Sequence, residues 1–404
     1  MHVNQLRALL CCAILVFSLG VSAAPEASAT LHALVEQAWL RSPSLRGAIA
    51  RQEEVDAARA LSGSWVAGQP ILELSQRTGR SGGQDGARES EVTMSASFWT
   101  PAQRSARQGL AQHSAAELQS ELVKVRLDIA GEVRARLWDA AAAQALREEK
   151  EGQLHNIEKL ADEVKRRVAA GDLARLDALL AEQEVQGARV AVEQAGADTS
   201  ASLAKLRILT GPTGALPLEP EPLASASATG DPRVLAARAT QSLAQATLRL
   251  AQASRRAPPT LALSLREERD PLLAAPDRSV GLRLQLPLGS AGRNRPVEAQ
   301  AQTQLAVAGA AALQSEQLAL AELDLARTRI EHARTALAAA GARVSATREH
   351  EQLIEKAFRL GERGLADMLR SHALAHEARL ARRQQEIALG RAHAEFNQAS
   401  GVLP

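Results

Sequence analysis

Two very long segments without proline constrain this chain more than any other feature. Residues 102–169 and 297–360 contain no proline, and Gly171 and Gly361 follow directly or almost directly after them. Apolar residues recur in both segments at three-, four- or seven-residue spacing, which is typical of a coiled-coil seam rather than of a broad globular face. At about 1.5 Å per residue, each predicted helix is on the order of 100 Å long.

The two long segments belong to an internal duplication. Four landmarks of the first half recur in the second half at an offset of 189 or 190 residues: Pro43 with Pro232, Pro70 with Pro259, Gly171 with Gly361, and Thr210-Gly211 with Ser400-Gly401. A common offset over the whole length indicates two copies of one structural unit. We therefore expect the same order of elements in each half.

Each half also contains two short segments in which apolar and polar residues alternate. The clearest apolar sets are Val92, Met94, Ala96 and Phe98; Leu261, Leu263 and Leu265; and Val280, Leu282, Leu284 and Leu286. Runs of about nine residues match the length of a tilted membrane-spanning strand. The sequence predicts strands at about 71–79, 90–99, 260–267 and 279–287.

The predicted organisation is mainly α with a small β part. A first repeat spans residues 24–211, a linker rich in Pro, Ser, Gly and Ala spans 212–231, and a second repeat spans 232–404. In the first repeat, we expect one helix from Leu31 towards Leu61, a long helix at about 102–170 and a return helix at about 172–210. In the second repeat, we expect helices from Pro232 towards Arg255, at about 297–360 and at about 365–400.

The first 23 residues predict a cleaved signal peptide. Arg7 supplies a basic start, residues 8–20 an apolar core, and residues 21–23 a small-residue cleavage site. A single membrane anchor is the alternative, but the apolar core is shorter than the roughly 20 residues of a spanning helix. Cys11 and Cys12 lie in this segment, so the mature chain is expected to have no disulfide and no thiolate metal site.

Composition narrows the possible functions. The formal net charge is only +2, which gives no strong field for nucleic acid, and aromatic residues make up 2% of the chain. No set of nucleophile, base and orienting group emerges from the sequence, so we predict no enzymatic activity and no cofactor. The four predicted strands pose a separate problem, because an open sheet cannot satisfy its backbone in a bilayer and common closed barrels need at least eight strands. Several copies would have to pool their strands.

This arrangement resembles the TolC-like outer membrane efflux family over essentially the whole mature chain. "LVEQAWLRSPSLRGA" resembles its N-terminal signature, and residues 167–183 and 359–369 resemble its two helical turns. The segment "VGLRLQLPLGSAGRNRPVEAQAQ" is similar to the second-strand region of the branch that serves heavy-metal cation exporters of the CzcC type.

The resemblance implies a homotrimer with a twelve-stranded barrel and a periplasmic tunnel of twelve helices. It also implies partnership with a periplasmic adaptor (membrane fusion) protein, with an inner-membrane pump of the RND type and with outer membrane lipid. The implied function is passive conduction of substrate, with heavy-metal cations preferred. Small organic compounds or type I protein secretion are alternatives in the same architecture, and a periplasmic coiled-coil scaffold without a barrel is an alternative of another class.

The resemblance also assigns candidate residues to a periplasmic gate. Asp367 stands where the family has a ring of carboxylates, and Arg363 and Asp177 stand where an ion pair holds the closed state. Arg370 occupies the position of a second acidic ring, so a single ring is expected. The residues implied at the tip turns and the adaptor contact are Gly171, Leu173, Gly361, Gly364 and Leu365.

The turn residues also have a purely structural interpretation. Gly171 and Gly361 fit left-handed C-caps, and Asp172, Asp177 and Asp367 suit helix N-termini. His372 and His376 are four residues apart, a spacing that can seat a metal, but no third ligand is evident. We interpret them as solvated structural histidines and predict no metal site.

Overall fold

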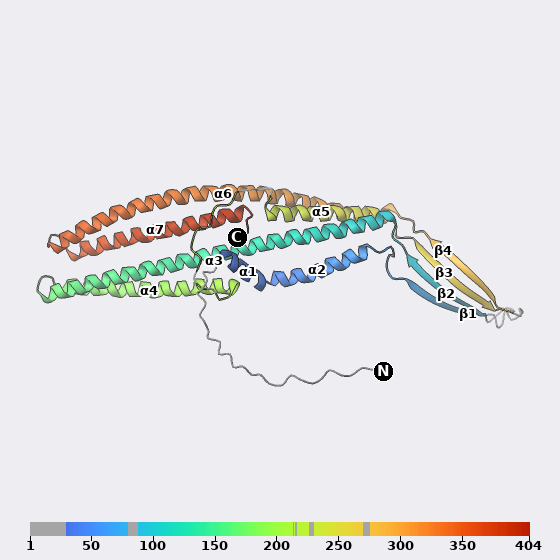
Figure 1. The fold of residues 1–404 in the computed structure, drawn as a ribbon, viewed down its shortest axis with the longest axis horizontal. Helices are drawn as coiled ribbons and strands as arrows, with labels where there is room; N and C mark the ends of the chain where they lie inside the picture. Colours follow the sequence, from blue (N-terminus) through green and yellow to red (C-terminus); the bar gives the residue numbers. More distant parts are fainter. Residues whose placement is uncertain (1–29, 80–87, 213, 215, 226–229, 270–274) are drawn as a thin grey trace, which may run out of the picture.

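The computed structural model describes residues 30–79, 88–212, 214, 216–225, 230–269 and 275–404. Figure 1 shows a long, narrow molecule with its strands at one end and two helical turns at the other. The predicted fold, mainly α with a small antiparallel sheet, is confirmed. Within the described residues, none of the helices combines the length and the hydropathy needed to cross a bilayer. The predicted signal peptide and both cysteines lie outside these residues.

The elements of the two repeats follow the same order. The first repeat comprises α1 (Leu31–Arg41), α2 (Pro43–Ser62), β1 (Ile71–Thr78), β2 (Arg88–Ser97), α3 (Pro101–Ala169) and α4 (Arg175–Thr210). The second repeat comprises α5 (Pro232–Ala253), β3 (Thr260–Arg269), β4 (Asp277–Gln285), α6 (Ala291–Arg359) and α7 (Leu365–Ala399). Both α3 and α6 have 69 residues, which corresponds to about 100 Å of helix.

The N-terminal segment forms two helices, so the prediction of one helix from Leu31 towards Leu61 is wrong. Ser42 has extended backbone angles and separates α1 from α2. Its side chain caps α2 by accepting a hydrogen bond from the Ser44 amide at 3.1 Å. The physical reason is Pro43, because proline disfavours helical angles in the preceding residue while suiting the first position of a new helix.

Helix α6 begins at Ala291, six residues earlier than predicted, and includes Pro296. Pro296 lies in the first two turns, where its missing amide removes a single helical hydrogen bond. Two contacts to Arg255, at the end of α5, hold this segment. The Asn294 side-chain amide donates to the Arg255 carbonyl at 2.7 Å, and the Arg255 guanidinium pairs with Glu298 at 2.7 Å. These tertiary contacts outweigh the local preference against proline.

Helices stack end to end along the two long helices. Helix α4 covers the part of α3 nearer the tip, and α1 and α2 cover the part nearer the sheet; α7 and α5 cover α6 in the same way (Figure 1). Leu34 of α1 and Leu206 of α4 share a buried cluster with Val133 of α3. Gly401, at the end of α7, lies so close to Pro232 of α5 that an added Cβ would be 2.7 Å from Pro232 Cδ.

The linker between the repeats is anchored at mid-height. Arg134 of α3 is buried, and its guanidinium pairs with Glu221 of the linker at 2.8 Å. Asn397 of α7 contacts the same carboxylate at 3.1 Å and accepts a hydrogen bond from the Ala224 amide at 3.0 Å. A buried pair with such additional hydrogen bonds fixes the path of the linker across the helices.

Trp138 of α3 packs against Gly390 of α7 where the two repeats meet. Trp138 is 4% exposed, and an added Cβ on Gly390 would clash with the outer edge of the indole ring. The absence of a side chain at residue 390 therefore permits the close approach of α3 and α7. Gly341 lies inside α6, and a Cβ added there would meet no other atom within 4 Å. A substitution at Gly341 is therefore the control for one at Gly390.

We predict that Gly390→Ala lowers the free energy of unfolding by about 1–3 kcal/mol, because a methyl group overpacks the contact with Trp138. Gly341→Ala is expected to be neutral or to stabilise by up to about 1 kcal/mol, because alanine favours the helix. Chemical denaturation of the detergent-solubilised chain, followed by circular dichroism, measures both. Equal stability of the two variants would contradict the packing argument.

Candidate membrane surface and helical tip

One face of the four-stranded sheet is apolar and exposed. The strand register places Leu72, Met94, Leu263 and Leu282 in one row across the sheet. The row beside it is Leu74, Val92, Leu265 and Val280, and a third contains Ala96, Leu261 and Leu284. The ten larger side chains are between 40% and 73% exposed in the chain. An apolar patch of this kind marks a protein or lipid contact rather than a surface facing water.

The opposite face of the sheet is polar. The register places five acidic and three basic residues on this face. The acidic residues are Glu73, Glu89, Glu91, Glu268 and Asp277, and the basic residues are Arg77, Arg266 and Arg283. Arg266 pairs with Glu89 at 3.1 Å and with Glu268 at 3.0 Å. This face therefore carries a net formal charge of −2 in each chain.

Strands β1 and β4 are the two edges of the sheet. The order is β1-β2-β3-β4, and each neighbouring pair is antiparallel. Within the chain, β1 pairs only with β2, and β4 pairs only with β3, as far as the described residues show. Each edge strand thus presents backbone donors and acceptors to a further strand.

Aromatic and arginine side chains meet where the sheet joins the helices. Val66 and Phe98 form a β-bridge, and the Trp99 amide donates to the Trp65 carbonyl at 2.8 Å, so Trp65, Phe98 and Trp99 lie together. The Arg104 guanidinium lies 4.3 Å from the Trp65 ring, and Arg107 lies 3.6 Å from the Trp99 ring. Sequence inspection missed Trp65, because it lies in neither a strand nor a helix. Tryptophan is enriched at membrane interfaces, so this end of the sheet is a candidate headgroup boundary.

The two tip turns have the same backbone geometry. Gly171 and Gly361 have φ of 88° and 78°, as expected of left-handed C-cap residues. In the first turn the Gly171 amide donates to Val168 at 3.1 Å and the Asp172 amide to Arg167 at 2.9 Å. The second turn repeats both bonds. The four bonds close the ends of α3 and α6 with backbone groups of the turns themselves.

The structure places the predicted gate residues at the tip but does not join all three within one chain. Arg363 lies 3.6 Å from Asp367, one helical turn away, and both side chains are about half exposed. Asp177 instead accepts a hydrogen bond from the Ala174 amide at 3.1 Å, at the start of α4. An ion pair between Arg363 and Asp177 would therefore require another copy of the chain or a different state of the tip.

The residues predicted for the adaptor contact differ in accessibility. Leu365 is 2% exposed and packs in a core that all four tip helices share, and Leu173 is partly buried against it. The Leu365 side chain therefore faces the core of this chain rather than its surface, and the assignment of Leu365 to the adaptor contact stays a prediction. The apolar side chains that the tip exposes are Leu176, Leu179 and Leu360.

The two histidines of α7 are not solvated as predicted. His372 Nδ1 lies 2.6 Å from a Glu351 carboxylate oxygen, and His376 is 6% exposed. Burial, reinforced by the positive charges of Lys150 and Arg379, lowers the pKa of His376 to about 4. Among the described residues, no three His, Cys, Asp or Glu side chains are grouped to hold a metal ion.

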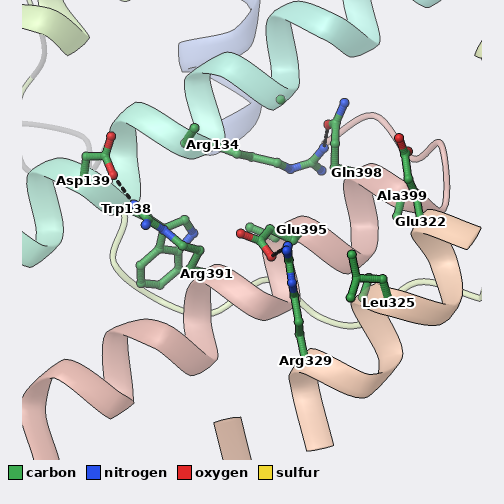
Figure 2. A pocket seen from close by; sticks show the side chains of 14 residues that line it. Arg134, Trp138, Asp139, Glu322, Leu325, Arg329, Arg391, Glu395, Gln398 and Ala399 are labelled. Atoms are coloured by element: carbon green, nitrogen blue, oxygen red, sulfur yellow. Dashed lines mark hydrogen bonds and ion pairs between the residues drawn. The ribbon is translucent and has the colours of Figure 1, made fainter. Parts of the chain in front are cut away.

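A cavity of about 440 Å³ lies between α3, α6 and α7, where the two repeats meet (Figure 2). Its charged side chains are joined in pairs: Asp139 with Arg391, and Arg329 with Glu395 at 2.7 Å. Arg134 and Glu322 have their own partners, Glu221 and Arg233. Because each charge on the wall is paired, the cavity serves as a joint between helices.

Comparison with solved structures identifies this fold among bacterial outer membrane channels. The outer membrane protein VceC from Vibrio cholerae superposes with a TM-score of 0.74 at 18% identity, covering 92% of this chain and 96% of that protein. The CmeC outer membrane channel of Campylobacter jejuni gives 0.73 at 13% identity, covering 99% and 94%. The open state of the MtrE outer membrane channel of Neisseria gonorrhoeae gives 0.69 at 17%, covering 92% and 89%.

No family model matches the sequence, and no curated protein matches it. The likeness therefore rests on three-dimensional structure and establishes the fold, which is the one that the resemblance implies. The superpositions cover nearly all of this chain and nearly all of the other chains. The likeness therefore includes both the helical part and the strands. Two of these solved structures are described as outer membrane channels and the third as an outer membrane protein.

We predict that Asp177→Ala frays the start of α4, because the Ala174 amide loses its side-chain acceptor. Loss of such a cap typically costs about 0.5–2 kcal/mol. Hydrogen exchange at residues 174–178 should accelerate accordingly. Asp172→Ala, at an exposed position of the same turn, is the control and should leave exchange there unchanged. Identical exchange in the two variants would show that Asp177 does not hold the turn.

Proposed function

We propose that this chain is the outer membrane channel component of a tripartite efflux system. Three copies would join their sheets into a twelve-stranded barrel and their helices into a periplasmic tunnel. The observation that carries the proposal is the exposed apolar face of the sheet, which is opposite a polar face. That pattern is what a barrel strand needs, with lipid on one side and an aqueous channel on the other.

The dimensions of the apolar face agree with a bilayer span. From Val280 to Leu286 the apolar side chains extend over about 20 Å at roughly 3.4 Å per residue, close to the outward apolar band of outer membrane barrels, about 25 Å. Beyond this band the same face turns polar, with Ser90, Glu267 and Arg278 across three neighbouring strands. Trp65 and Phe98 lie at the other end of the sheet.

The free edges of the sheet support assembly from several copies. A backbone group without a partner in lipid costs several kcal/mol, so β1 and β4 require further strands there. Joining β4 of one copy to β1 of the next satisfies both edges, and three copies would supply the twelve strands that the resemblance implies. The alternative, a periplasmic coiled-coil scaffold without a barrel, would leave the apolar face of the sheet in water. It is therefore the less favourable of the two.

The proposed role is passive conduction, without enzymatic activity or cofactor, between an inner-membrane pump of the RND type and the outside. Gly171, Leu173, Gly361 and Gly364, with the exposed Leu176 and Leu360, would lie where a periplasmic adaptor docks. For the substrate we propose heavy-metal cations, based on the resemblance of residues 280–302 to the CzcC-type branch. The net negative charge of the polar sheet face supports a preference for cations. Export by a cleaved signal peptide at 1–23 is part of the same proposal.

A matched pair of substitutions tests the membrane face. Leu263→Arg places a charge in the middle of the apolar rows and is expected to cost about 2–4 kcal/mol of membrane stability. Ser264→Arg, the next residue on the polar face, should be tolerated. Heat-modifiable migration and retention in the outer membrane fraction measure the effect. If both variants behave alike, or if the parent protein is a soluble monomer, the channel proposal fails.

The proposed gate has its own test. Arg363→Ala removes the cation that would hold Asp177 in the closed state, so single-channel conductance in a planar bilayer should rise. The increase should be moderate, because an exposed ion pair contributes about 0–1 kcal/mol. Arg359→Ala is the control, since Arg359 pairs with Glu355 of its own helix at 3.2 Å. Unchanged conductance of the Arg363 variant would remove Arg363 from the gate while leaving the channel intact.

A further inference from the structure

His376 lies in the seam between the two helical hairpins, α3–α4 and α6–α7. It stands eleven residues after Leu365, the first residue of α7, or about 17 Å from the tip along the helix axis. The side chain is 6% exposed, and its Nε2 atom has no hydrogen-bond partner among the described residues. Buried polar atoms without partners are rare, so this position calls for a physical explanation.

The imidazole borders a cavity of about 40 Å³ between the hairpins. Gln153 and Asn156 of α3 line the cavity from one side, Glu184 of α4 from a second, and His372 and Arg379 of α7 from the third. A space of this size holds one or two water molecules. The seam is therefore polar and loosely filled here.

The apolar core between His376 and the tip contrasts with this polar section. Leu160 and Val164 of α3 pack there with Met368 and Leu365 of α7. Arg167 of α3 also lies over the Phe358 ring of α6 at 4.9 Å. The hairpins are thus joined by apolar contacts at the tip and by the histidine section behind them.

Charged groups surround His376 from every neighbouring helix. Lys150 comes from α3, Glu184 from α4 and Arg379 from α7 itself. Glu351 of α6 is already engaged, by His372 at 2.6 Å and by Arg379 at 3.5 Å. Burial has the largest effect on the pKa of His376, and the charges of Lys150 and Arg379 come next; all three lower it. Both are cations, so the neutral imidazole is the form that the closed seam accepts.

We propose that His376 makes this seam acid-sensitive, so that protonation of its imidazole parts the α3–α4 hairpin from the α6–α7 hairpin near the tip. The added charge would lie between Lys150 and Arg379 in a section without room for a full hydration shell. Separation of the hairpins lets water solvate the imidazolium. If the chain acts as the proposed channel, the same separation would widen its periplasmic end in acid; that consequence rests on the proposed function.

The direction of the pH dependence follows from the lowered pKa of His376. The exposed imidazole has an ordinary pKa of 6.5, whereas the closed seam holds it at about 4. The stabilisation of the closed seam is therefore complete above pH 6.5 and is lost as the pH falls towards 4. Between pH 7.5 and pH 5 the equilibrium constant for closure should fall about 30-fold.

Hydrogen exchange of the purified full-length chain in detergent tests the proposal. Exchange at residues 365–380 and 150–164 is compared at pH 7.5 and pH 5 between the parent protein and His376→Gln. Comparison at the same pH cancels the intrinsic effect of pH on exchange. The parent should lose about 30-fold more protection than the variant. His350→Gln, which removes a histidine bonded to Ser371 at 3.1 Å, is the control and should behave like the parent.

A second variant decides the question if His376→Gln does not fold. Lys150→Gln removes a half-buried surface cation next to the imidazole and should reduce the loss of protection in acid. If His376→Gln folds, its loss of protection matching that of the parent would overturn the proposal; if it does not fold, equal loss in the parent and Lys150→Gln would overturn it. Bilayer conductance at the two pH values is measured separately: a protein that never conducts would refute the channel, while the exchange result would still decide the role of His376.

Discussion

The unpaired backbone edges of the four-stranded sheet are the constraint on which the rest of the structure depends. A sheet with an apolar outer face has no stable place in water, and a sheet with two free edges has none in lipid. In the proposed channel, closure with strands from other copies meets both conditions. The helices that continue from the sheet would then surround the same axis, so the requirement at the sheet would set the symmetry of the whole assembly.

In the proposed channel, duplication lets one chain supply a wall with the same number of helices along its length. Neither α4 nor α7 is as long as the helix on which it packs, and in each repeat the shorter helix meets α1 or α5 end to end. Every level of the proposed wall would therefore contain the same number of helices from each chain. The positions that permit these junctions are small or rigid, as Gly401 beside Pro232 illustrates. The buried pair of Arg134 and Glu221 fixes the linker where the repeats meet.

Features repeated along the chain could be predicted from the sequence, whereas features set by a unique tertiary contact could not. The strands, the long helices and the glycine turns could be predicted from the apolar periodicity, the positions of proline and the constant offset between the two halves. The break at Ser42 was missed although Pro43 signalled it, because the apolar pattern continues across it. The start of α6 depends on the contacts of Arg255 with Asn294 and Glu298. The burial of Leu365 and His376 depends on which helices pack against α7, and the local sequence around these residues does not indicate those neighbours.

The two tip turns satisfy their own backbone groups, with a left-handed glycine and two hydrogen bonds apiece. These bonds are made by the backbone of each turn itself. Residues such as Asp172, Leu176 and Glu362 are thus free to change without altering the backbone that displays them. In such a turn the backbone sets the shape, and the exposed side chains can vary to contact different partners. Related chains could exchange partners through a few surface substitutions at the tip while the hundred-ångström framework behind it stayed the same.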